Sequence, residues 1–245
     1  MELSSSPDLN AVGLDAEAVN ALRYDGHLDH PLEVGGGLKS FMPAGVRVLD
    51  VGCGTGAATL IANSGRSNDI LAVEPDTERA NIARSRGLQV HTGMLTPTLQ
   101  AEIGQFDVVM SSDVLEHTPA PAEFLDLLKR SMKKDGLLLI SVPNVAHWSV
   151  RFMLLRGRFD YEPTGIMDST HLRWFTAASL RALFERSGLE ILDMKQTAGV
   201  MLPVYGRSIL RRIPERLKSP AIRLGTRALP NLFGVQHVIK AKLAS

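Results

Sequence analysis

The chain has 245 residues, of which 44% are hydrophobic and 22% charged, a composition that is typical of a globular protein and excludes a disordered chain. Its 27 basic and 26 acidic residues give a formal charge of +1, so no chain-wide field favours nucleic acid. The single cysteine, Cys53, excludes an intramolecular disulfide framework and a cysteine-based zinc cluster, and it favours a reducing, cytoplasmic compartment.

The N-terminal part of the chain carries few structural signals. Residues 1–10 are polar and rich in serine, and residues 15–23 have the pattern of a short helix. Residues 1–20 contain no Lys or Arg, and no apolar run in the sequence approaches the ~20 residues that cross a bilayer. We therefore expect neither a secretion signal nor a membrane-spanning helix.

From residue 46 onward, short apolar runs alternate with amphipathic stretches. The apolar runs predict strands at 46–51, 69–74, 88–92, 106–111, 136–142, 189–194 and 232–243. The amphipathic stretches predict helices at 55–64, 76–86, 120–132 and 176–187. Strands that are apolar on both faces and alternate with helices indicate an α/β fold with a parallel sheet covered on both sides.

A glycine-rich turn joins the first predicted strand to the first predicted helix. Gly52, Gly54 and Gly56 follow Asp50 there, where glycine lets a ligand approach the backbone and the helix N-terminus attracts an anion. Gly52, Gly54 and Ala57 also fit the dinucleotide-binding pattern G-x-G-x-x-G/A, and a tight turn without a ligand is a further alternative. Glu74 ends the second strand, where a carboxylate can accept hydrogen bonds from both hydroxyls of a ribose.

Four segments occur in an order that is characteristic of one enzyme family: VLDVGCGTG (48–56), LAVEPD (71–76), FDVVMSSDVLEH (106–117) and MKKDGLLLISVPN (132–144). Together they resemble the motif set of class I S-adenosylmethionine-dependent methyltransferases, from about residue 46 to residue 194. The resemblance implies a Rossmann-like, mostly parallel seven-stranded sheet of order 3-2-1-4-5-7-6, with strand 7 antiparallel and helices on both faces. It also implies S-adenosylmethionine as cofactor, with S-adenosylhomocysteine as its product.

The resemblance assigns roles around the glycine-rich turn. It implies that Gly52, Gly54 and Gly56 approach the methionine part of the cofactor, that Asp50 supports the turn and that Glu74 holds the ribose. The physical argument agrees, because the methionine carboxylate is an anion that a helix N-terminus can accept.

Four more residues are expected at the cofactor. The family usually offers an acidic residue to the adenine amine after the third strand, where this chain has Met94. Met94 and Leu95 would form an apolar slot for the ring, or would simply pack in the core. Ser112 and Asp113 follow the fourth strand, at the sheet edge where open α/β folds bind ligands. Asp113 is expected at the methionine end of the cofactor or the substrate rim, with a helix cap as the alternative.

The acceptor site is expected after the fifth strand. The segment GRFDYEPTGIMDSTHLRWFT (157–176) resembles class I methyltransferases of glycan and lipopolysaccharide biosynthesis and related small-molecule O-methyltransferases. This resemblance places Asp168 and His171 near the acceptor, with His171 as general base and Asp168 orienting it. In the alternative, His171 braces the following helix. Further acceptor contacts are expected at Tyr24, Arg151 and His117, although bracing the sheet is the favoured role of His117.

Transfer of a methyl group to a hydroxyl of a small-molecule or glycan-type acceptor is the leading hypothesis. In-line displacement at a sulfonium needs alignment and protection from water but no metal. A metal would take part only if Asp113, Asp168 and His171 converged. The alternatives are an N-methyltransferase acting on an amino sugar or metabolite, an NAD(P)-dependent oxidoreductase, and a cofactor-binding protein without catalytic activity.

A single domain over residues 1–245 is expected. Its parts are an N-terminal cap region (1–45), a cofactor-binding half (46–142), a lid or acceptor insertion (143–175) and C-terminal strands (176–245) with a basic segment (206–229).

The basic segment 206–229 holds seven basic residues and one acidic residue, a net charge of +6. Apolar residues are interleaved with these charges, and Pro214 and Pro220 are expected to interrupt a helix. One interpretation is a solvated helical face that covers the sheet. In the other interpretation, this segment and the basic residues of the lid form one patch, which attracts an anionic or lipid-linked acceptor at a membrane surface.

Overall fold

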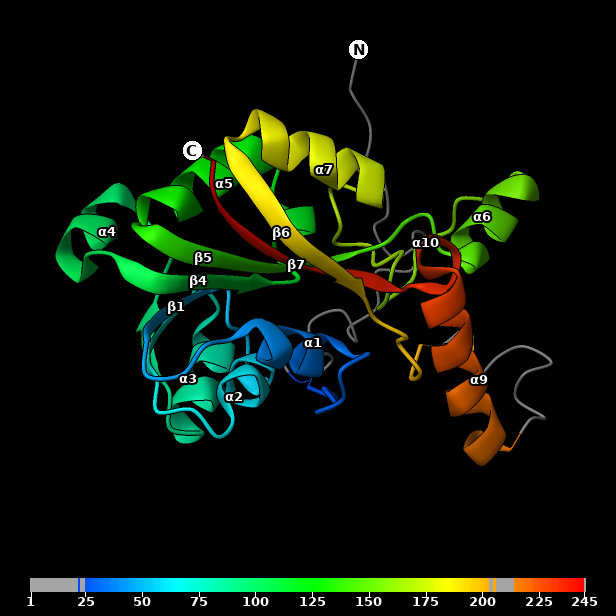
Figure 1. The fold of residues 1–245 in the computed structure, drawn as a ribbon, viewed down its shortest axis with the longest axis horizontal. Helices are drawn as coiled ribbons and strands as arrows, with labels where there is room; N and C mark the ends of the chain where they lie inside the picture. Colours follow the sequence, from blue (N-terminus) through cyan, green and yellow to red (C-terminus); the bar gives the residue numbers. More distant parts are fainter. Residues whose placement is uncertain (1–21, 23–24, 203–204, 206–213, 245) are drawn as a thin grey trace, which may run out of the picture.

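A seven-stranded sheet forms the centre of the computed structural model, which describes residues 22, 25–202, 205 and 214–244 (Figure 1). The strand order is β3-β2-β1-β4-β5-β7-β6, as expected from the motifs. The strands are β1 (Arg47–Val51), β2 (Asp69–Glu74), β3 (Gln89–Thr92), β4 (Phe106–Ser112), β5 (Met132–Pro143), β6 (Leu189–Gln196) and β7 (Gln236–Leu243).

The direction of the strands decides which residues meet at the functional edge. Strands β1 to β5 pair in parallel, whereas β7 runs antiparallel to both β5 and β6. The carboxyl ends of β1, β2, β4 and β5 therefore share one edge. Because β7 is antiparallel, its first residue, Gln236, lies opposite Pro143, the last residue of β5. The predicted order and the antiparallel strand are both confirmed.

Helices cover both faces of the sheet, with α1, α2 and α3 on one side and α4, α5 and α7 on the other (Figure 1). Helices α6, α9 and α10 lie together at one end. None of the described helices combines the length and the apolar character that crossing a bilayer requires. The helices are α1 (Val34–Phe41), α2 (Ala57–Asn63), α3 (Thr77–Ser85), α4 (Pro97–Ile103), the short 3₁₀ turn η3 (Leu115–His117), α5 (Pro121–Arg130), α6 (Trp148–Leu155), α7 (Ala177–Arg186), α9 (Glu215–Ala228) and α10 (Pro230–Phe233).

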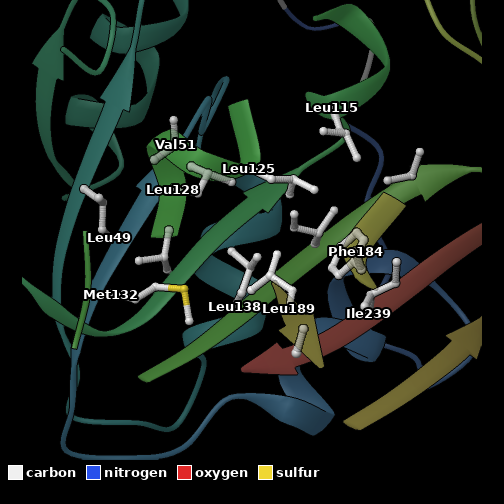
Figure 2. Close-up of a cluster of buried hydrophobic side chains, with 14 of the residues drawn as sticks. Leu49, Val51, Leu115, Leu125, Leu128, Met132, Leu138, Phe184, Leu189 and Ile239 are labelled. Atoms are coloured by element: carbon white, nitrogen blue, oxygen red, sulfur yellow. The ribbon is translucent and has the colours of Figure 1, made fainter. Parts of the chain in front are cut away.

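Alternate residues of the central strands feed two separate cores. Leu49 and Leu138 point to the α5 and α7 side, where they belong to the cluster in Figure 2 that contains Leu125 and Phe184. Their neighbours along the strands, such as Val48, pack with α1 and α2 on the other side. Because Leu125 is completely buried, replacing it with Ala is expected to cost about 2–5 kcal/mol of stability.

Local signals fix several helix ends. Asp76 caps α3 by accepting a hydrogen bond from the Arg79 amide (2.9 Å), as the acidic position before that helix predicts. Thr176 caps α7 in a reciprocal pair with Ser179. Gly188 follows α7 with a φ of 66°, the left-handed conformation that ends many helices.

The structure differs from the sequence prediction in its helices. The strand predicted over 232–243 was wrong at its start, because α10 begins with Pro230 at a favourable first position and β7 begins only at Gln236. Helix α9 continues through Pro220, which was expected to interrupt it. Pro220 is exposed, so water can solvate the carbonyl that loses its partner. The helix predicted at 15–23 lies almost entirely outside the described residues.

Helices α1, α4 and α6 were not predicted. Three consecutive glycines, 35–37, lower the helix propensity of α1. The structure explains them by close packing, since a Cβ at Gly36 would lie 2.1 Å from the carbonyl oxygen of His30.

Candidate functional site

The glycine-rich turn lies between β1 and α2, at the carboxyl edge of the sheet. Gly52, Gly54 and Gly56 have φ angles of 79°, 56° and 79°, which residues with side chains rarely adopt. A Cβ at Gly52 would lie 2.5 Å from Val114, and one at Gly56 would lie 2.4 Å from Leu88. A Cβ at Gly54 would meet no atom within 4 Å. Gly54 therefore faces open space, whereas Gly56 lets α2 pack closely on Leu88.

Glu74 connects the turn to the end of β2. Its side chain is 4% exposed, and Oε2 accepts a hydrogen bond from the Gly54 amide at 2.8 Å. Its other oxygen, Oε1, accepts one from the Asp76 amide at 3.0 Å. Two backbone amides thus fix the carboxylate, and each oxygen retains a second lone pair. The arrangement can accept two further hydroxyl donors from the cavity side.

Asp50 lies beneath the turn and is almost completely buried. The Thr59 hydroxyl donates a hydrogen bond to its Oδ2 at 2.5 Å, and Oδ1 has no hydrogen-bond partner among the described residues. Burial raises the pKa of Asp50 to about 7, and the nearby charge of Glu74 contributes in the same direction. The carboxyl group therefore supports the turn with a proton bound over much of the acidic range.

Asp25, which the sequence analysis did not single out, closes the outer side of the turn. Its carboxylate binds both terminal nitrogens of Arg86, at 2.6 and 2.7 Å, and accepts the Thr55 hydroxyl at 2.6 Å. The hydrogen bond from Arg86 is the main cause that lowers the pKa of Asp25 to about 2. Because Asp25 is 30 and 61 positions away from these partners, no local pattern could have indicated the contact. The next residues, His27 and Leu28, line the cavity.

A cavity of about 840 Å³ connects the turn to the lid. The predicted cofactor residues that line it are Asp50, Gly52, Gly54, Glu74, Met94, Leu95, Ser112 and Asp113. Gly56 stands outside this lining, and its approach to a ligand stays a prediction. Met94 is 68% exposed and Leu95 only 6%, so Leu95 is the residue of the pair that also packs in the core.

Asp113 follows β4 in a strained conformation. Its φ of 55° is the only positive value at a non-glycine position among the described residues. Its amide donates to the Ser141 carbonyl oxygen at 3.1 Å, and its Oδ1 accepts a hydrogen bond from Gln236 Nε2 at 2.7 Å. Ser112 also contacts the Ser141 side chain, with 2.8 Å between the two hydroxyl oxygens. Gln236 was missed, because only the antiparallel pairing of β7 brings it to this edge.

Three side chains from two segments meet in the cavity: Glu116 and His117 of η3, and His171. Their candidate ligand atoms all lie within 4.8 Å of one another, and His171 Nε2 is 3.9 Å from Glu116 Oε1. The rings of His117 and His171 meet edge to face, with centroids 4.8 Å apart. Glu116 is 1% exposed, and neither of its carboxylate oxygens has a hydrogen-bond partner in the described part of the chain. Two imidazoles and a carboxylate in this arrangement could bind a proton, a hydroxyl group or a cation.

Both histidines are oriented by backbone carbonyl oxygens. His171 Nδ1 lies 3.1 Å from the Ile166 carbonyl oxygen, and His117 Nδ1 lies 3.1 Å from that of Thr170. A carbonyl oxygen can only accept, so each Nδ1 holds a proton and each Nε2 is the basic nitrogen. Burial raises the pKa of Glu116 well above its ordinary value, and the charges of Asp113 and Asp168 add to the effect.

The remaining acceptor predictions fall elsewhere. Asp168 stands outside the cavity lining, and its Oδ1 accepts hydrogen bonds from the amide (2.8 Å) and hydroxyl (2.6 Å) of Thr170. It therefore shapes the turn that leads to His171. Arg151 also stands outside the lining, because its guanidinium folds back onto the Ala146 carbonyl oxygen at 2.6 Å on exposed α6. Tyr24 lies outside the described residues.

Comparison with known proteins identifies the family. The chain matches the methyltransferase domain family over residues 24–194. It is 30% identical over 168 residues to a ubiquinone biosynthesis O-methyltransferase of Ruegeria sp. (strain TM1040), which covers 64% of this chain and 66% of that protein. The matched stretch thus spans about two thirds of the length of this curated relative.

Two solved structures show the same fold. One is a methyltransferase in complex with the Haloferax volcanii Trm112 methyltransferase activator, with a TM-score of 0.62, 16% identity and coverage of 95% of this chain and 96% of that chain. The other is a SAM-dependent methyltransferase from Archaeoglobus fulgidus, with a TM-score of 0.57, 21% identity and coverage of 85% and 92%. The family match excludes the alternative of an NAD(P)-dependent oxidoreductase. The resemblance carried by four short motifs is confirmed: this chain belongs to the methyltransferase domain family and is a class I enzyme that uses S-adenosylmethionine.

Proposed function

We propose that the protein transfers a methyl group to a hydroxyl of a small-molecule acceptor, with His171 as the general base. The observation that carries the proposal is the orientation of the His171 ring. Its Nδ1 is committed to the Ile166 carbonyl oxygen, which leaves Nε2 as the basic nitrogen on the side of Glu116. His171 lines the same cavity as the glycine-rich turn, so a base and a cofactor site are joined in one enclosure.

The residues at the turn fit the cofactor. Glu74 would hold the ribose hydroxyls, because backbone amides already fix its carboxylate beside the cavity. Gly54 would let the ligand approach the backbone, since the space a Cβ would take is open. Met94 and Leu95 would flank the adenine, and Ser112 and Asp113 would lie toward the methionine end. When bound, S-adenosylmethionine supplies an electrophilic methyl group on a sulfonium.

His171 would accept the proton of the acceptor hydroxyl at Nε2. The charge that forms on the imidazole has compensation nearby, because the Glu116 carboxyl lies 3.9 Å away. Burial, with the charges of Asp113 and Asp168, holds the pKa of Glu116 high in the resting state. An imidazolium beside it favours the ionised carboxylate, so as His171 takes the acceptor proton, Glu116 would release its own proton toward the cavity. The result would be a neutral imidazolium–carboxylate pair. Positioned bases of this kind contribute typically 10²–10⁴-fold to the rate.

The lining of the cavity favours an acceptor with an apolar body. Leu28, Val34, Ile166, Leu202 and Val235 contribute to its walls. A glycan-type acceptor would leave several hydroxyls without partners on such walls. The name of the Ruegeria relative, an O-methyltransferase, supports a hydroxyl acceptor over an amine. N-methylation of an amino sugar or metabolite is the alternative, and an anionic or lipid-linked acceptor and a cytoplasmic location stay predictions.

A divalent cation is a second means of activating the hydroxyl. Two observations favour it. Neither carboxylate oxygen of Glu116 has a hydrogen-bond partner among the described residues. In His117 and His171, Nδ1 contacts a backbone carbonyl oxygen, so Nε2 is the nitrogen that could bind a cation. A carboxylate with two imidazoles suits Zn²⁺, Fe²⁺ or Mn²⁺. This set differs from the Asp113, Asp168 and His171 group considered from the sequence, and His117 is the member that a simple base mechanism does not need.

Turnover of single variants tests the proposal and separates the two mechanisms. The assay follows S-adenosylhomocysteine release with a panel of phenols, sugar alcohols and amines. If His171 is the base, His171→Ala loses about 10²–10⁴ in turnover with cofactor affinity retained, while His117→Ala and added EDTA have little effect. If a cation takes part, both variants and EDTA abolish turnover, and adding the metal restores the chelated wild-type enzyme. His91→Ala, at an exposed position of β3, is the matched control.

Several outcomes would contradict the base assignment. Full turnover of His171→Ala with an amine acceptor would favour N-methylation. An equal fall of cofactor affinity and turnover would make His171 structural. Tight binding of S-adenosylhomocysteine without transfer to any acceptor of the panel would support a protein that binds the cofactor without catalysis.

A further inference from the structure

Helix α9 carries an apolar stripe on its solvent side. Leu217, Ala221, Leu224 and Ala228 are spaced so that they share one face of the helix. All four are exposed, and Leu217 and Leu224 are 59% and 67% accessible. The apolar face of a helix normally packs against the core, so this stripe is unusual in having no partner among the described residues.

The opposite face attaches α9 to the rest of the chain. Thr226 is 2% exposed, and its hydroxyl contacts the carbonyl oxygens of Ile222 (3.0 Å) and Phe233 (3.3 Å). A Cβ at Gly225 would lie 3.5 Å from the Phe233 ring of α10, which shows how closely the two helices pack. Rotating the apolar stripe inward would break these contacts. The outward orientation is therefore a property of the fold.

Basic residues flank the stripe on both sides. Helical geometry places Arg216 and Arg227 along one border and Lys218 along the other, and both arginines are exposed. Residues 214–229 contain four basic residues and one acidic residue. A narrow apolar stripe bordered by Arg and Lys is the pattern of a helix that lies in the headgroup region of an anionic membrane, where long basic side chains reach the phosphates.

The end of α6 offers a second surface of the same kind. Figure 1 places α6 and α9 at the same end of the longest axis of the molecule, with α10 between them. Leu155 is 82% exposed and Phe152 46% exposed. The guanidinium of Arg156 lies 3.8 Å from the centre of the Phe152 ring, so a positive charge again borders exposed apolar groups.

We propose that α9 and the C-terminal end of α6 form a surface that docks on membranes containing anionic lipids. Leu217, Leu224 and Leu155 enter the headgroup region, and Arg216 and Arg227 contact lipid phosphates. Association with a second copy of the chain is disfavoured, because it would bring the same basic borders together. Each basic residue near an anionic membrane strengthens binding by about fivefold at low salt, an attraction that salt screens.

The docking surface adjoins the cavity. Met201 lies between β6 and α9 in the sequence. It lines the cavity, and its side chain is 71% exposed. Burial lowers the pKa of His30, and the positive charges of Arg223 and Arg227 on α9 lower it further. Helix α9 therefore lies near His30. Three residues after His30, Glu33 lines the cavity. A docked molecule would present its cavity to amphiphilic acceptors in the lipid layer. This last step rests on the proposed function, whereas docking itself does not.

Co-sedimentation of the full chain with vesicles tests the proposal. We expect binding to vesicles that contain phosphatidylglycerol, weaker binding at high salt, and little binding to phosphatidylcholine alone. The double variant Leu217→Ser/Leu224→Ser should bind about tenfold more weakly. Arg216→Glu/Arg227→Glu should bind at least roughly 25-fold more weakly, from two basic residues at fivefold each. Leu60→Ser on α2 and Lys134→Glu on β5, both at exposed positions, are the matched controls and should bind as the wild type.

Absence of binding to anionic vesicles, or equal binding to neutral and anionic vesicles, would overturn the proposal. So would a dimer in analytical ultracentrifugation that Leu217→Ser/Leu224→Ser converts to monomer, because the stripe would then serve a second copy. Calorimetry with S-adenosylhomocysteine, unchanged in all four variants, shows that they fold. Vesicle binding requires no acceptor, so a failure of methyl transfer and a failure of docking are observed separately.

Discussion

At the end of the cavity proposed for the cofactor (the cofactor end), backbone amides hold the Glu74 side chain. At the end proposed for the acceptor (the acceptor end), side chains from separate segments contact one another. Glu74 is fixed by the amides of Gly54 and Asp76, which follow the ends of β1 and β2 by three and two residues. Glu116 and His171 come from segments more than fifty residues apart, and Gln236 joins Asp113 from the last strand. The cofactor end is thus a local product of the turn, and the acceptor end depends on the packing of the whole sheet. Variants at the two ends should therefore fail in different ways.

The largest effect is expected from Gly54→Val, which should remove detectable binding of S-adenosylhomocysteine in calorimetry. The new side chain would project into the open space beside Glu74, and the φ of 56° disfavours any Cβ. Gly65→Val is the matched control, because Gly65 also has a positive φ (74°) and open surroundings but stands outside the cavity. Normal binding by Gly54→Val would show that the turn is not part of the site.

The next effect concerns stability and the proton on Asp50. The folded pKa of about 7 exceeds the ordinary value of 3.8, so the folded state binds this proton more tightly than the unfolded chain. Its stabilisation is complete below about pH 4 and is lost as the pH rises toward 7, on the order of 4 kcal/mol in total. Asp50→Asn should lack this decline. Chemical unfolding of both proteins at several pH values measures the difference, and parallel pH profiles would contradict the assignment.

Glu74→Ala should weaken binding of S-adenosylhomocysteine by about 1.5–3 kcal/mol, or 10- to 150-fold, because charge-assisted hydrogen bonds to the ribose are lost. Turnover at saturating cofactor should change less than affinity, since Glu74 lies away from the His171 cluster. Glu78→Ala, at an exposed position of α3, is the control. Unchanged affinity would mean that the carboxylate serves the two backbone amides alone.

The smallest effect is expected at the junction of the two ends. Gln236→Leu removes the 2.7 Å hydrogen bond to Asp113 but keeps the size of the side chain. We expect a loss of roughly tenfold in kcat/KM, about 1.4 kcal/mol, since one hydrogen bond to the Asp113 carboxyl group is lost. Gln105→Leu, exposed between α4 and β4, is the control. A fall in cofactor affinity alone would place Asp113 wholly at the cofactor end.

The same contrast explains what the sequence could predict. The strand order followed from the resemblance of four motifs to class I methyltransferases. The glycine turn and the position of Glu74 had contiguous signals of their own: an apolar run, then glycines, then a carboxylate twenty residues on. Asp168 was expected to orient His171 because the two are three residues apart. In the structure its Oδ1 accepts hydrogen bonds from Thr170, in the turn that leads to His171, and the orienting role stays a prediction.

Other features had only a partial local signal, or none. Glu116 belongs to the motif FDVVMSSDVLEH (106–117), but nothing in the sequence indicates that its carboxylate is 1% exposed and lies beside His171. The contact of Asp25 with Arg86 joins residues 61 positions apart. The apolar stripe of α9 was visible as interleaved charge and hydrophobicity, but the face that turns outward is decided by packing on α10.

Asp113 has a left-handed backbone conformation, so selection for stability and selection for turnover should favour different residues at this position. A non-glycine residue in this region costs on the order of 1–3 kcal/mol unless its surroundings compensate. Repeated rounds of selection for heat resistance alone should therefore enrich Gly or Asn at position 113, which adopt the conformation more readily. Selection for turnover should restore Asp, because its Oδ1 accepts a hydrogen bond from Gln236 Nε2 across the end of β5, which Gly cannot do, and its second oxygen is also an acceptor, where Asn has a donor. Position 113 would then report, in the outcome of an evolution experiment, which of the two pressures was stronger.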